Sequence, residues 1–314
     1  MAFFSVIIPV YNKQNFVFNT IQSVLSQTFS DFEIIIINDG STDESENEIL
    51  KFSDKRINYF KQKNSGLSAT RNLGIKNGVS DFLVFLDADD IWEIGFLDKI
   101  HSLVVNFPEA KIYATNYYEV YPNGLKMKPK TTLNFFDKDG LIKDYFKASL
   151  GQPIYCFCCL CIHKSVFKTI GLFNENITYG EDIDFNIRAN LKFKVAYSST
   201  AFANYSVFSE NQITNSSFKN KITVDFLTYE KENLNDLSLK KYLDFNRYLI
   251  AKKYKIIQDK INYNRMKSEI DFNNLNYKQL FLLFSPLYIE EVFSKIKSYL
   301  LKKGVRLSSY TKVI

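Results

Sequence analysis

Three carboxylates stand together directly after an apolar run. Asp87, Asp89 and Asp90 follow residues 82–86, which read FLVFL. Neighbouring carboxylates repel one another and each loses hydration on burial, so the cluster calls for a positive charge. Mg²⁺ and Mn²⁺ prefer oxygen ligands and complete their coordination shells with substrate phosphates. The cluster therefore predicts a divalent metal that meets a nucleotide diphosphate.

Helix capping is a simpler explanation for two of these aspartates. Asp89 and Asp90 would cap a helix that begins near Glu93, a role worth about 1 kcal/mol. A D-x-D pattern alone also arises often by chance. The metal interpretation therefore depends on whether other polar groups come to the same place.

Other residues have side chains suited to a binding site, and each has a structural alternative. Asp39, in INDGST, can accept hydrogen bonds from a base or ribose, or form an Asx turn before Gly40. Arg71, in SGLSATRNLG, can meet phosphate or the acidic cluster, or form an ordinary ion pair. Glu181 and Asp182, in YGEDID, can cap a helix or take a proton from a hydroxyl.

Strand and helix patterns alternate along the first hundred residues, which predicts an α/β fold with a mostly parallel sheet flanked by helices. Ligands of such sheets bind at the carboxyl ends of the strands. The predicted strands are residues 4–10, 33–37, 57–62 and 81–86, and the predicted helices are residues 15–27, 43–52 and 67–76.

Polar clusters follow three of these predicted strands. Tyr11 and Asn12 follow the first strand, Asp39 follows the second, and Asp87 and Asp89 follow the fourth. Because parallel strands end at the same edge of a sheet, we expect the three clusters to converge.

The remaining core is less regular. We expect a strand at 112–120, an irregular loop at 121–151, a strand at 155–163 and a helix at 183–191. The strand at 155–163 contains all four cysteines, in YCFCCLCIH. A single C-x-C-C-x-C block fits a zinc finger poorly, so buried thiols are favoured over a metal or redox role.

Charge divides the chain into two parts. Residues 219–314 contain 19 Lys and Arg against 10 Asp and Glu, whereas residues 1–218 contain 21 against 24. We therefore predict a core domain at 1–218 and a basic helical extension at 219–314. Because the core is acidic and the extension has no recognised motif, nucleic-acid binding is not expected.

No apolar run reaches the ~18 residues that a spanning helix requires, and no signal peptide is apparent. The extension contains the apolar stretch LFLLFSPLYI, flanked by Lys295, Lys297, Lys302, Lys303 and Arg306. Such an arrangement suits an interfacial helix on an anionic membrane. We expect a cytoplasmic protein that can lie on the inner face of the cytoplasmic membrane; an accessory bundle or dimer surface is the alternative.

Five ordered motifs resemble glycosyltransferase family 2 on the GT-A fold. They are SVIIPVYN, EIIIINDGSTD, NSGLSATRNLG, FLVFLDADD and GLFNENITYGEDIDFNIR. The resemblance covers roughly residues 3–200 and leaves the extension outside. It implies transfer of a sugar from a nucleotide diphosphate sugar to an acceptor hydroxyl, with inversion at the anomeric carbon.

The resemblance also implies roles for single residues. Asp182 would take the proton from the acceptor hydroxyl and Glu181 would orient the acceptor or the helix. Asp89 would bind Mn²⁺ or Mg²⁺ with help from Asp87, which would also contact the ribose or donor sugar. The nucleotide-binding residues would be Pro9, Tyr11, Asn12, Asp39, Arg71, Asp87 and Ala88.

The sequence departs from the family pattern in two places. Many members have a Tyr-Arg-x-His stretch whose His completes the metal site, but residues 204–212 read NYSVFSENQ. His163 is expected to be structural, so the metal would depend on Asp89, Asp87 and water. The other departure is NDGS in place of DDGS, which leaves Asp39 in position.

The resemblance favours a UDP-sugar donor and a saccharide or lipid-linked saccharide acceptor in bacterial surface polysaccharide, lipopolysaccharide or capsule synthesis. Two other functions fit part of the pattern. A sugar-phosphate nucleotidyltransferase would share the fold, but usually has a Gly-rich loop after the first strand, and IIPVYNKQN contains no glycine. A noncatalytic nucleotide-sugar binding protein would not need Asp182.

Overall fold

A sheet whose main strands run in one direction forms the centre of the protein. The computed structural model describes residues 2–131, 133, 139–302 and 305. The sheet order is β3-β2-β1-β4-β9-β6-β10-β5, with β7 beside β6 and β8 beside β10. The strands are β1 (Phe4–Val10), β2 (Phe32–Asn38), β3 (Ile57–Lys61), β4 (Phe82–Phe85), β5 (Ile91–Trp92), β6 (Ile112–Val120), β7 (Lys126–Met127), β8 (Gly140–Ile142), β9 (Leu160–His163) and β10 (Val195–Ser206).

The first half of the sheet is parallel, as the alternating pattern predicts. β1 pairs in parallel with β2 and β4, and β2 pairs in parallel with β3. The apolar residues of β1, β2 and β4 are almost all buried, because helices cover the sheet. In register, Val10 lies beside Asn38, so β1 and β2 end together.

The second half of the sheet contains an antiparallel insertion. β9 lies between β4 and β6 and is antiparallel to both, while β6 and β10 pair in parallel. The predicted strand at 155–163 is wrong in its first half, because Phe157–Cys159 forms a 3₁₀ turn. There the Cys159 amide donates to the Cys156 carbonyl, and the Trp92 indole donates to the Cys158 carbonyl. Because of this turn, strand β9 begins only at Leu160.

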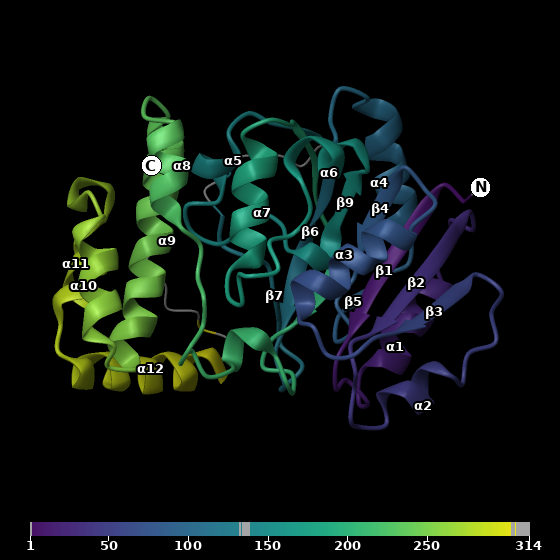
Figure 1. Cartoon of the computed structure of the whole chain (residues 1–314), viewed down its shortest axis with the longest axis horizontal. Helices are drawn as coiled ribbons and strands as arrows, with labels where there is room; N and C mark the ends of the chain where they lie inside the picture. Colours follow the sequence, from purple (N-terminus) through teal and green to yellow (C-terminus); the bar gives the residue numbers. More distant parts are fainter. Residues whose placement is uncertain (1, 132, 134–138, 303–304, 306–314) are drawn as a thin grey trace.

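Helices flank the sheet and connect its strands (Figure 1). α3 packs so close to β1 that a Cβ at Gly74 would lie 2.4 Å from the Ile7 side chain. The helices of this part are α1 (Val17–Leu25), α2 (Ser45–Ile49), α3 (Leu67–Asn77), α4 (Phe96–Asn106), α5 (Tyr145–Ala148), α6 (Ser165–Ile170) and α7 (Glu181–Asn190). The segment 121–151, expected to be irregular, contains β7, β8 and α5; its residues 132 and 134–138 lie outside the described residues.

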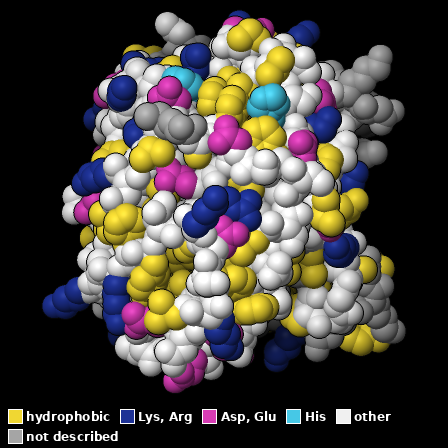
Figure 2. Space-filling view, turned by 90° about the vertical axis from the view of Figure 1, so that its right-hand side faces the viewer, with side chains coloured by type: hydrophobic (Ala, Val, Ile, Leu, Met, Phe, Trp, Pro, Cys, Tyr) yellow, Lys and Arg dark blue, Asp and Glu magenta, His cyan; other side chains and the backbone are white. Residues whose placement is uncertain are grey.

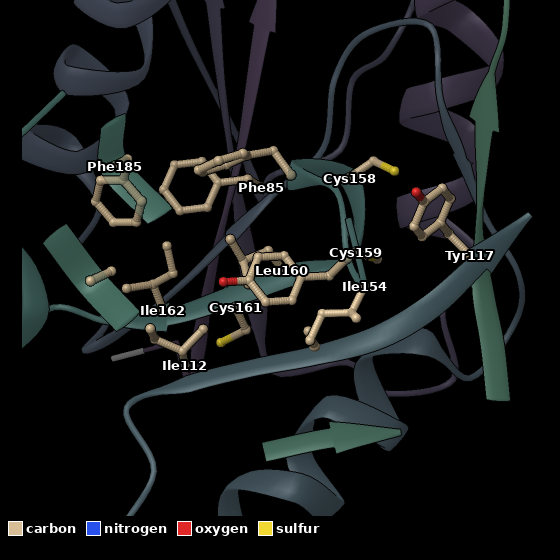
Figure 3. Close-up of a cluster of buried hydrophobic side chains, with 14 of the residues drawn as sticks. Phe85, Ile112, Tyr117, Ile154, Cys158, Cys159, Leu160, Cys161, Ile162 and Phe185 are labelled. Carbon is tan, nitrogen blue, oxygen red and sulfur yellow. The ribbon is translucent and has the colours of Figure 1, made fainter. Parts of the chain in front are cut away.

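The four cysteines lie at the centre of the buried core. All are free thiols, and Cys158, Cys159 and Cys161 are buried. Figure 3 shows these three among apolar side chains that include Phe85 and Ile162. No group of three or more His, Cys, Asp or Glu residues that could hold a metal occurs in the described part of the chain. Cys158, Cys159 and Cys161 thus have the surroundings of small core side chains.

The helices within residues 219–302 lie at the end of the molecule opposite β3 and α2 (Figure 1). α12 runs across one end of α9, α10 and α11. Tyr242 of α9 packs on Tyr145 and Phe146 of α5, so the extension shares the main apolar core. These helices are α8 (Phe226–Glu232), α9 (Leu237–Ile256), α10 (Lys260–Ser268), α11 (Tyr277–Phe284) and α12 (Leu287–Lys302).

Candidate active site

The chain turns sharply after β4 and presents Asp87 and Asp89 at the edge of the sheet. The Asp90 amide donates to the Asp87 carbonyl oxygen across 3.0 Å. The Thr20 hydroxyl, on α1, lies 3.0 Å from the Ala88 carbonyl oxygen and 2.9 Å from that of Asp90. Contacts with α1 therefore fix the backbone that positions both carboxylates.

The capping explanation for this cluster is wrong. Residues Ile91 and Trp92 form β5 instead of a helix, and α4 begins only at Phe96. Gly95, in the left-handed region at φ 88°, precedes that helix. The aspartates after β4 are thus separated from the nearest helix start and need another explanation.

Arg71 links the end of β4 to the start of α7. Its Nη2 lies 2.8 Å from Asp87 Oδ1, and its Nη1 lies 3.3 Å from Glu181 Oε1. The guanidinium is buried, with the rings of Phe157 and Phe173 centred 4.5 and 5.5 Å from its central carbon. The predicted contact with the acidic cluster is therefore confirmed, and it is itself an ion pair within the protein. Contact with phosphate stays a prediction.

The cation at Asp89 is Lys13, a residue that the sequence analysis did not single out. Lys13 Nζ lies 2.7 Å from Asp89 Oδ2, 2.6 Å from the Glu210 carbonyl oxygen and 3.5 Å from Ser209 Oγ. The Ser209 hydroxyl also donates to the Asp89 carboxylate. Lys13 and Asp89 are only 8% and 7% exposed. Oxygens from two distant segments thus surround one ammonium group.

Glu181 and Asp182 begin α7 after Gly180, which is in the left-handed region at φ 83°. Burial raises the pKa of Glu181 to about 7, the charge of Asp182 adds to the rise, and Arg71 opposes it. Burial likewise raises the pKa of Asp182 against the effect of Arg71. A carboxyl group whose pKa approaches neutrality is a better general base than an ordinary aspartate. The pair therefore has the protonation chemistry expected of a proton acceptor.

Asp90 differs from its two neighbours because it is completely buried. Burial raises its pKa well above the usual range, and the charges of Asp89 and Asp87 act in the same direction. Its Oδ1 accepts the Ser206 amide across 2.8 Å. Asp90 thus holds the end of β10 against the turn after β4.

Asp39 is a buried acceptor that connects β2 to the start of α3. Its carboxylate accepts the side-chain amide of Gln62 at 2.7 Å and the backbone amides of Ser65 and Gly66 at 2.8 and 2.9 Å. The alternative of an Asx turn at Asp39 is wrong, because its carboxylate accepts these distant amides instead. The neighbouring Asn38 Oδ1 accepts the Ser41 amide, three residues on, at 2.9 Å. The contact of Asp39 with a nucleotide stays a prediction.

The other predicted nucleotide-binding residues lie at the same edge. Pro9 is buried within β1, while the Tyr11 side chain is 41% exposed. Asn12 has φ 50°, and its Oδ1 accepts the Thr42 amide at 2.8 Å, which joins the loops after β1 and β2. Ala88 is buried and contributes its carbonyl oxygen to the contact with Thr20.

Residues 206–212, which we name the closing segment, cover Asp89. Besides Lys13, two contacts hold this segment to the loop after β1: Asn15 Nδ2 donates to Glu210 Oε2 at 2.9 Å, and Asn211 Nδ2 donates to the Asn12 carbonyl at 3.1 Å. Two sequence signals could have located this arrangement. Lys13 directly follows the Tyr11–Asn12 pair, and the closing segment lies where the sequence departs from the family's His-containing pattern.

Both histidines lie outside this site. His101 packs on Phe3 and Phe29 with ring centroids at 4.9 and 5.1 Å, and His163 Nδ1 lies 2.7 Å from Ser165 Oγ. The expected structural role of His163 is thus supported by its contacts.

Figure 2 shows one face of the molecule, on which Lys and Arg side chains are interspersed with Asp, Glu and apolar side chains. That face does not form a continuous basic surface.

The oxygens around Lys13 Nζ have the chemistry that a hard cation requires. A carboxylate, a hydroxyl and a backbone carbonyl are ligand types found around Mg²⁺ and Mn²⁺. Asp87 adds a nearby carboxylate, although its Oδ1 is paired with Arg71. The donor set fits a divalent cation, provided that the Lys13 ammonium leaves its position.

None of the described helices is long and apolar enough to cross a membrane.

Comparison with known proteins assigns the family. The model of "Glycosyl transferase family 2" matches residues 5–171, and the chain belongs to this family. An uncharacterized glycosyltransferase of Rickettsia felis is 33% identical over 281 residues, which cover 87% of this chain and 44% of that protein. The minor teichoic acid biosynthesis protein GgaA of Bacillus subtilis is 31% identical over 216 residues, covering 64% of this chain and 46% of GgaA. The chain thus spans less than half the length of these relatives.

A solved structure supports the fold assignment. Residues 1–349 of S. aureus TarS in complex with UDP-GlcNAc match with a TM-score of 0.60 and 17% identity, over 87% of this chain and 83% of the TarS chain. The likeness confirms the expected GT-A architecture, with a mixed α/β core built on a mostly parallel sheet.

Proposed function

We propose that the chain is an inverting glycosyltransferase that moves a sugar from a nucleotide diphosphate sugar to an acceptor hydroxyl. The observation that carries the proposal is the pairing of Arg71 with both Asp87 and Glu181. This contact joins the carboxylates after β4 to those that begin α7, so donor-binding and acceptor-activating groups share one site. Family membership supports the same reaction.

In the proposed reaction Asp182 accepts the proton of the acceptor hydroxyl as that oxygen attacks the anomeric carbon. The raised pKa of Asp182 favours this proton transfer, and Glu181 orients the acceptor or the start of α7. The bond between the sugar and the nucleoside diphosphate breaks as the new glycosidic bond forms. A single displacement of this kind inverts the anomeric configuration.

On the donor side, we propose that Asp89 holds Mn²⁺ or Mg²⁺ with help from Asp87. The Ser209 hydroxyl and the Glu210 carbonyl lie beside Asp89 and provide further oxygens. A bound divalent cation would stabilise the negative charge of the departing diphosphate. Tyr11 would lie along the base, while Pro9 and Ala88 shape the surrounding backbone. Asp39, Asn12 and Arg71 complete the proposed nucleotide-binding set.

The donor we propose is a UDP-sugar and the acceptor a saccharide or lipid-linked saccharide of a bacterial surface polymer. The support comes from other proteins. TarS was solved with UDP-GlcNAc, and GgaA is named for minor teichoic acid biosynthesis. A role in capsule or lipopolysaccharide synthesis belongs to the same proposal.

We further propose that residues 219–314 form a basic helical extension that places the catalytic domain, 1–218, on the inner face of the cytoplasmic membrane. Phe281, Phe284 and Phe293 of α11 and α12 are about half exposed, beside the exposed Lys295 and Lys297. An ion pair of 3.1 Å between Lys255 and Glu290 fixes α12 to α9. Apolar side chains next to lysines suit an anionic membrane surface. Lys303 and Arg306 lie outside the described residues.

A donor panel tests the proposed reaction. The protein is incubated with UDP-, GDP- and dTDP-sugars in Mn²⁺, Mg²⁺ or EDTA, with and without saccharide acceptors, and released nucleoside diphosphate is measured. We expect turnover of a UDP-sugar that EDTA suppresses. Binding of UDP-sugar without turnover under any of these conditions would contradict glycosyl transfer and favour a noncatalytic nucleotide-sugar binding protein.

A further inference from the structure

Lys13 Nζ occupies the position that a bound cation would take among oxygen ligands. Three kinds of oxygen, from Asp89, Ser209 and Glu210, lie within hydrogen-bond distance of it. The lysine follows the loop after β1 and reaches an aspartate 76 positions further along the chain. The ammonium thus supplies the positive charge that the run of aspartates requires.

A divalent cation cannot join this arrangement without displacing the ammonium. A cation that used Asp89 Oδ2 together with the Ser209 and Glu210 oxygens would occupy the position of the Lys13 ammonium. Both side chains are buried, so water screens the repulsion between the two positive charges poorly. Lys13 and the metal therefore exclude one another at this carboxylate.

Lys13 also ties the closing segment to the loop after β1. Its ammonium contacts the Glu210 carbonyl and Ser209 Oγ, in addition to the two amide contacts from Asn15 and Asn211. Phe208 and Asn211 both have positive φ, at 65° and 56°, and Phe208 is 57% exposed. Residues other than glycine reach this region only when surrounding contacts hold them there. The Lys13 ammonium is therefore one of several contacts that keep the closing segment in this conformation.

We propose that Lys13 is an exchangeable counter-ion of Asp89, and that a divalent cation binds there only when the Lys13 ammonium leaves. The Ser209 and Glu210 oxygens that contact the ammonium would then face the cation, so residues 206–212 stay over the donor site in both states. The proposal rests on the proposed function, in which Asp89 holds the metal. It assigns to Lys13 a role in setting metal affinity.

Mn²⁺ binding in the absence of nucleotide tests this role. Free Mn²⁺ is titrated by electron paramagnetic resonance into the full chain and its variants. Lys13→Gln should bind Mn²⁺ roughly tenfold more tightly than the wild type, because the competing charge is gone. Lys13→Arg keeps the charge and should bind about as weakly as the wild type. Lys99→Gln, at the ion pair with Asp139, is a matched control that should change nothing.

A Lys13→Gln variant with unchanged or weaker Mn²⁺ affinity would overturn the proposal. The double variant Lys13→Gln/Asp89→Asn should lose the increase in Mn²⁺ affinity. If the increase persists in the double variant, the metal binds elsewhere and the proposal is wrong. Hydrogen exchange of the wild-type amides at 207–212 gives a second readout that needs no variant. Exchange should become slower when Mn²⁺ is added, because a divalent cation would attract the Ser209 and Glu210 oxygens more strongly than the ammonium does. Exchange that stays the same or becomes faster would contradict the replacement of Lys13 by the metal.

The two proposals can fail separately. UDP binding by calorimetry and turnover of the donor panel are measured on the same preparations. If the wild type transfers sugar while Lys13→Gln leaves Mn²⁺ affinity unchanged, only the role of Lys13 is wrong. If no donor is turned over, the proposed function fails whatever Mn²⁺ does.

Discussion

The described part of the chain contains two buried arginines that are each paired with more than one carboxylate. They differ in how much positive charge is present to balance those carboxylates. Arg247, on α9, lies 2.6 Å from Glu230 and 3.0 Å from Asp244 through Nη1, and 3.2 Å from Glu269 through Nε. Lys240 adds a second cation, 2.8 Å from both Glu230 and Asp244. Two cations thus meet three carboxylates in the extension.

At the candidate active site a single guanidinium faces the negative charge of three carboxylates, those of Asp87, Glu181 and Asp182. This difference in charge balance changes the pKa values of Glu230 and Glu181 in opposite directions. Burial opposes ionisation of Glu230, but hydrogen bonds from Lys240 and Arg247 outweigh it and lower its pKa. Burial raises the pKa of Glu181 to about 7, and Arg71 only moderates the rise. The Arg247 cluster is suited to holding helices together, whereas the Arg71 cluster is suited to accepting protons.

The largest expected effect concerns the carboxylate proposed to hold the metal. Asp89→Ala should lower sugar transfer roughly 10³-fold, because the leaving diphosphate loses its charge stabilisation. It should also weaken Mn²⁺-dependent UDP binding, as measured by calorimetry. Glu269→Gln, at the Arg247 cluster, is the matched control and should leave transfer unchanged. Transfer at the wild-type rate by Asp89→Ala would remove this residue from the mechanism.

Replacing each arginine tests whether the Arg71 cluster serves the reaction and the Arg247 cluster serves stability. Arg71→Met and Arg247→Met should each lower the free energy of unfolding by about 3–5 kcal/mol, because buried carboxylates lose their partner. Urea denaturation measures this loss. Per folded molecule, Arg247→Met should keep its transfer rate and Arg71→Met should lose it. Equal loss of activity in the two variants would mean that Arg71 acts only through stability.

The sequence predicted the parts of the site that follow from local pattern. Strand ends located Asp39 and Asp87 at one edge, and the family motifs added Asp182 and Arg71. Lys13 was missed as the partner of Asp89 because the two residues are 76 positions apart in the chain. A contact at that separation leaves no periodic pattern in the sequence. The structure places Lys13 beside Asp89, and the metal predicted to supply positive charge there stays a prediction.

Two local predictions failed for a similar reason. The helix expected near Glu93 starts at Phe96, because residues 91–92 are recruited as β5 beside β10. The strand expected at 155–163 turns at Phe157–Cys159, where the Cys158 carbonyl accepts the Trp92 indole. In both cases a tertiary contact overrode the local hydrophobic pattern.

The two clusters should respond to pH in opposite directions. The raised pKa of Glu181 means that the folded state holds a proton that the unfolded chain releases nearer the ordinary glutamate pKa of 4.5. Its contribution to stability is present below that value and is lost as the pH rises through about 7. The lowered pKa of Glu230 gives a contribution that is present above its unfolded value and is lost as the pH falls through its folded pKa.

Urea denaturation from pH 4 to pH 8 measures both contributions. Relative to the wild type, Glu181→Gln should lose less stability between about pH 5 and pH 7, and Glu230→Gln should lose less below about pH 4.5. Transfer by the wild type should increase as the pH rises, because Asp182, whose pKa is raised by burial, must ionise before it can accept a proton. Identical pH profiles for the two variants would contradict the contrast between the clusters.

The smallest expected effect concerns the surface of the extension. Phe281→Ser/Phe284→Ser/Phe293→Ser should weaken binding to anionic liposomes at low salt by roughly tenfold, because less apolar surface can enter the interface. Sedimentation with liposomes measures the change. The control is Leu234→Ser/Leu237→Ser, which removes two apolar side chains outside α11 and α12 that are each 76% exposed. Unchanged partitioning of the triple variant would favour an accessory bundle or a dimer surface.

The most direct test compares one carboxylate from each cluster. Asp182→Asn and Asp244→Asn are prepared together, and sugar transfer, UDP affinity and the free energy of unfolding are measured on both. We predict that Asp182→Asn loses transfer by roughly 10³-fold or more while it keeps UDP affinity and stability. Asp244→Asn should lose stability and keep its transfer rate per folded molecule. If Asp182→Asn transfers sugar at the wild-type rate, the assignment of the α7 carboxylates to the reaction is wrong.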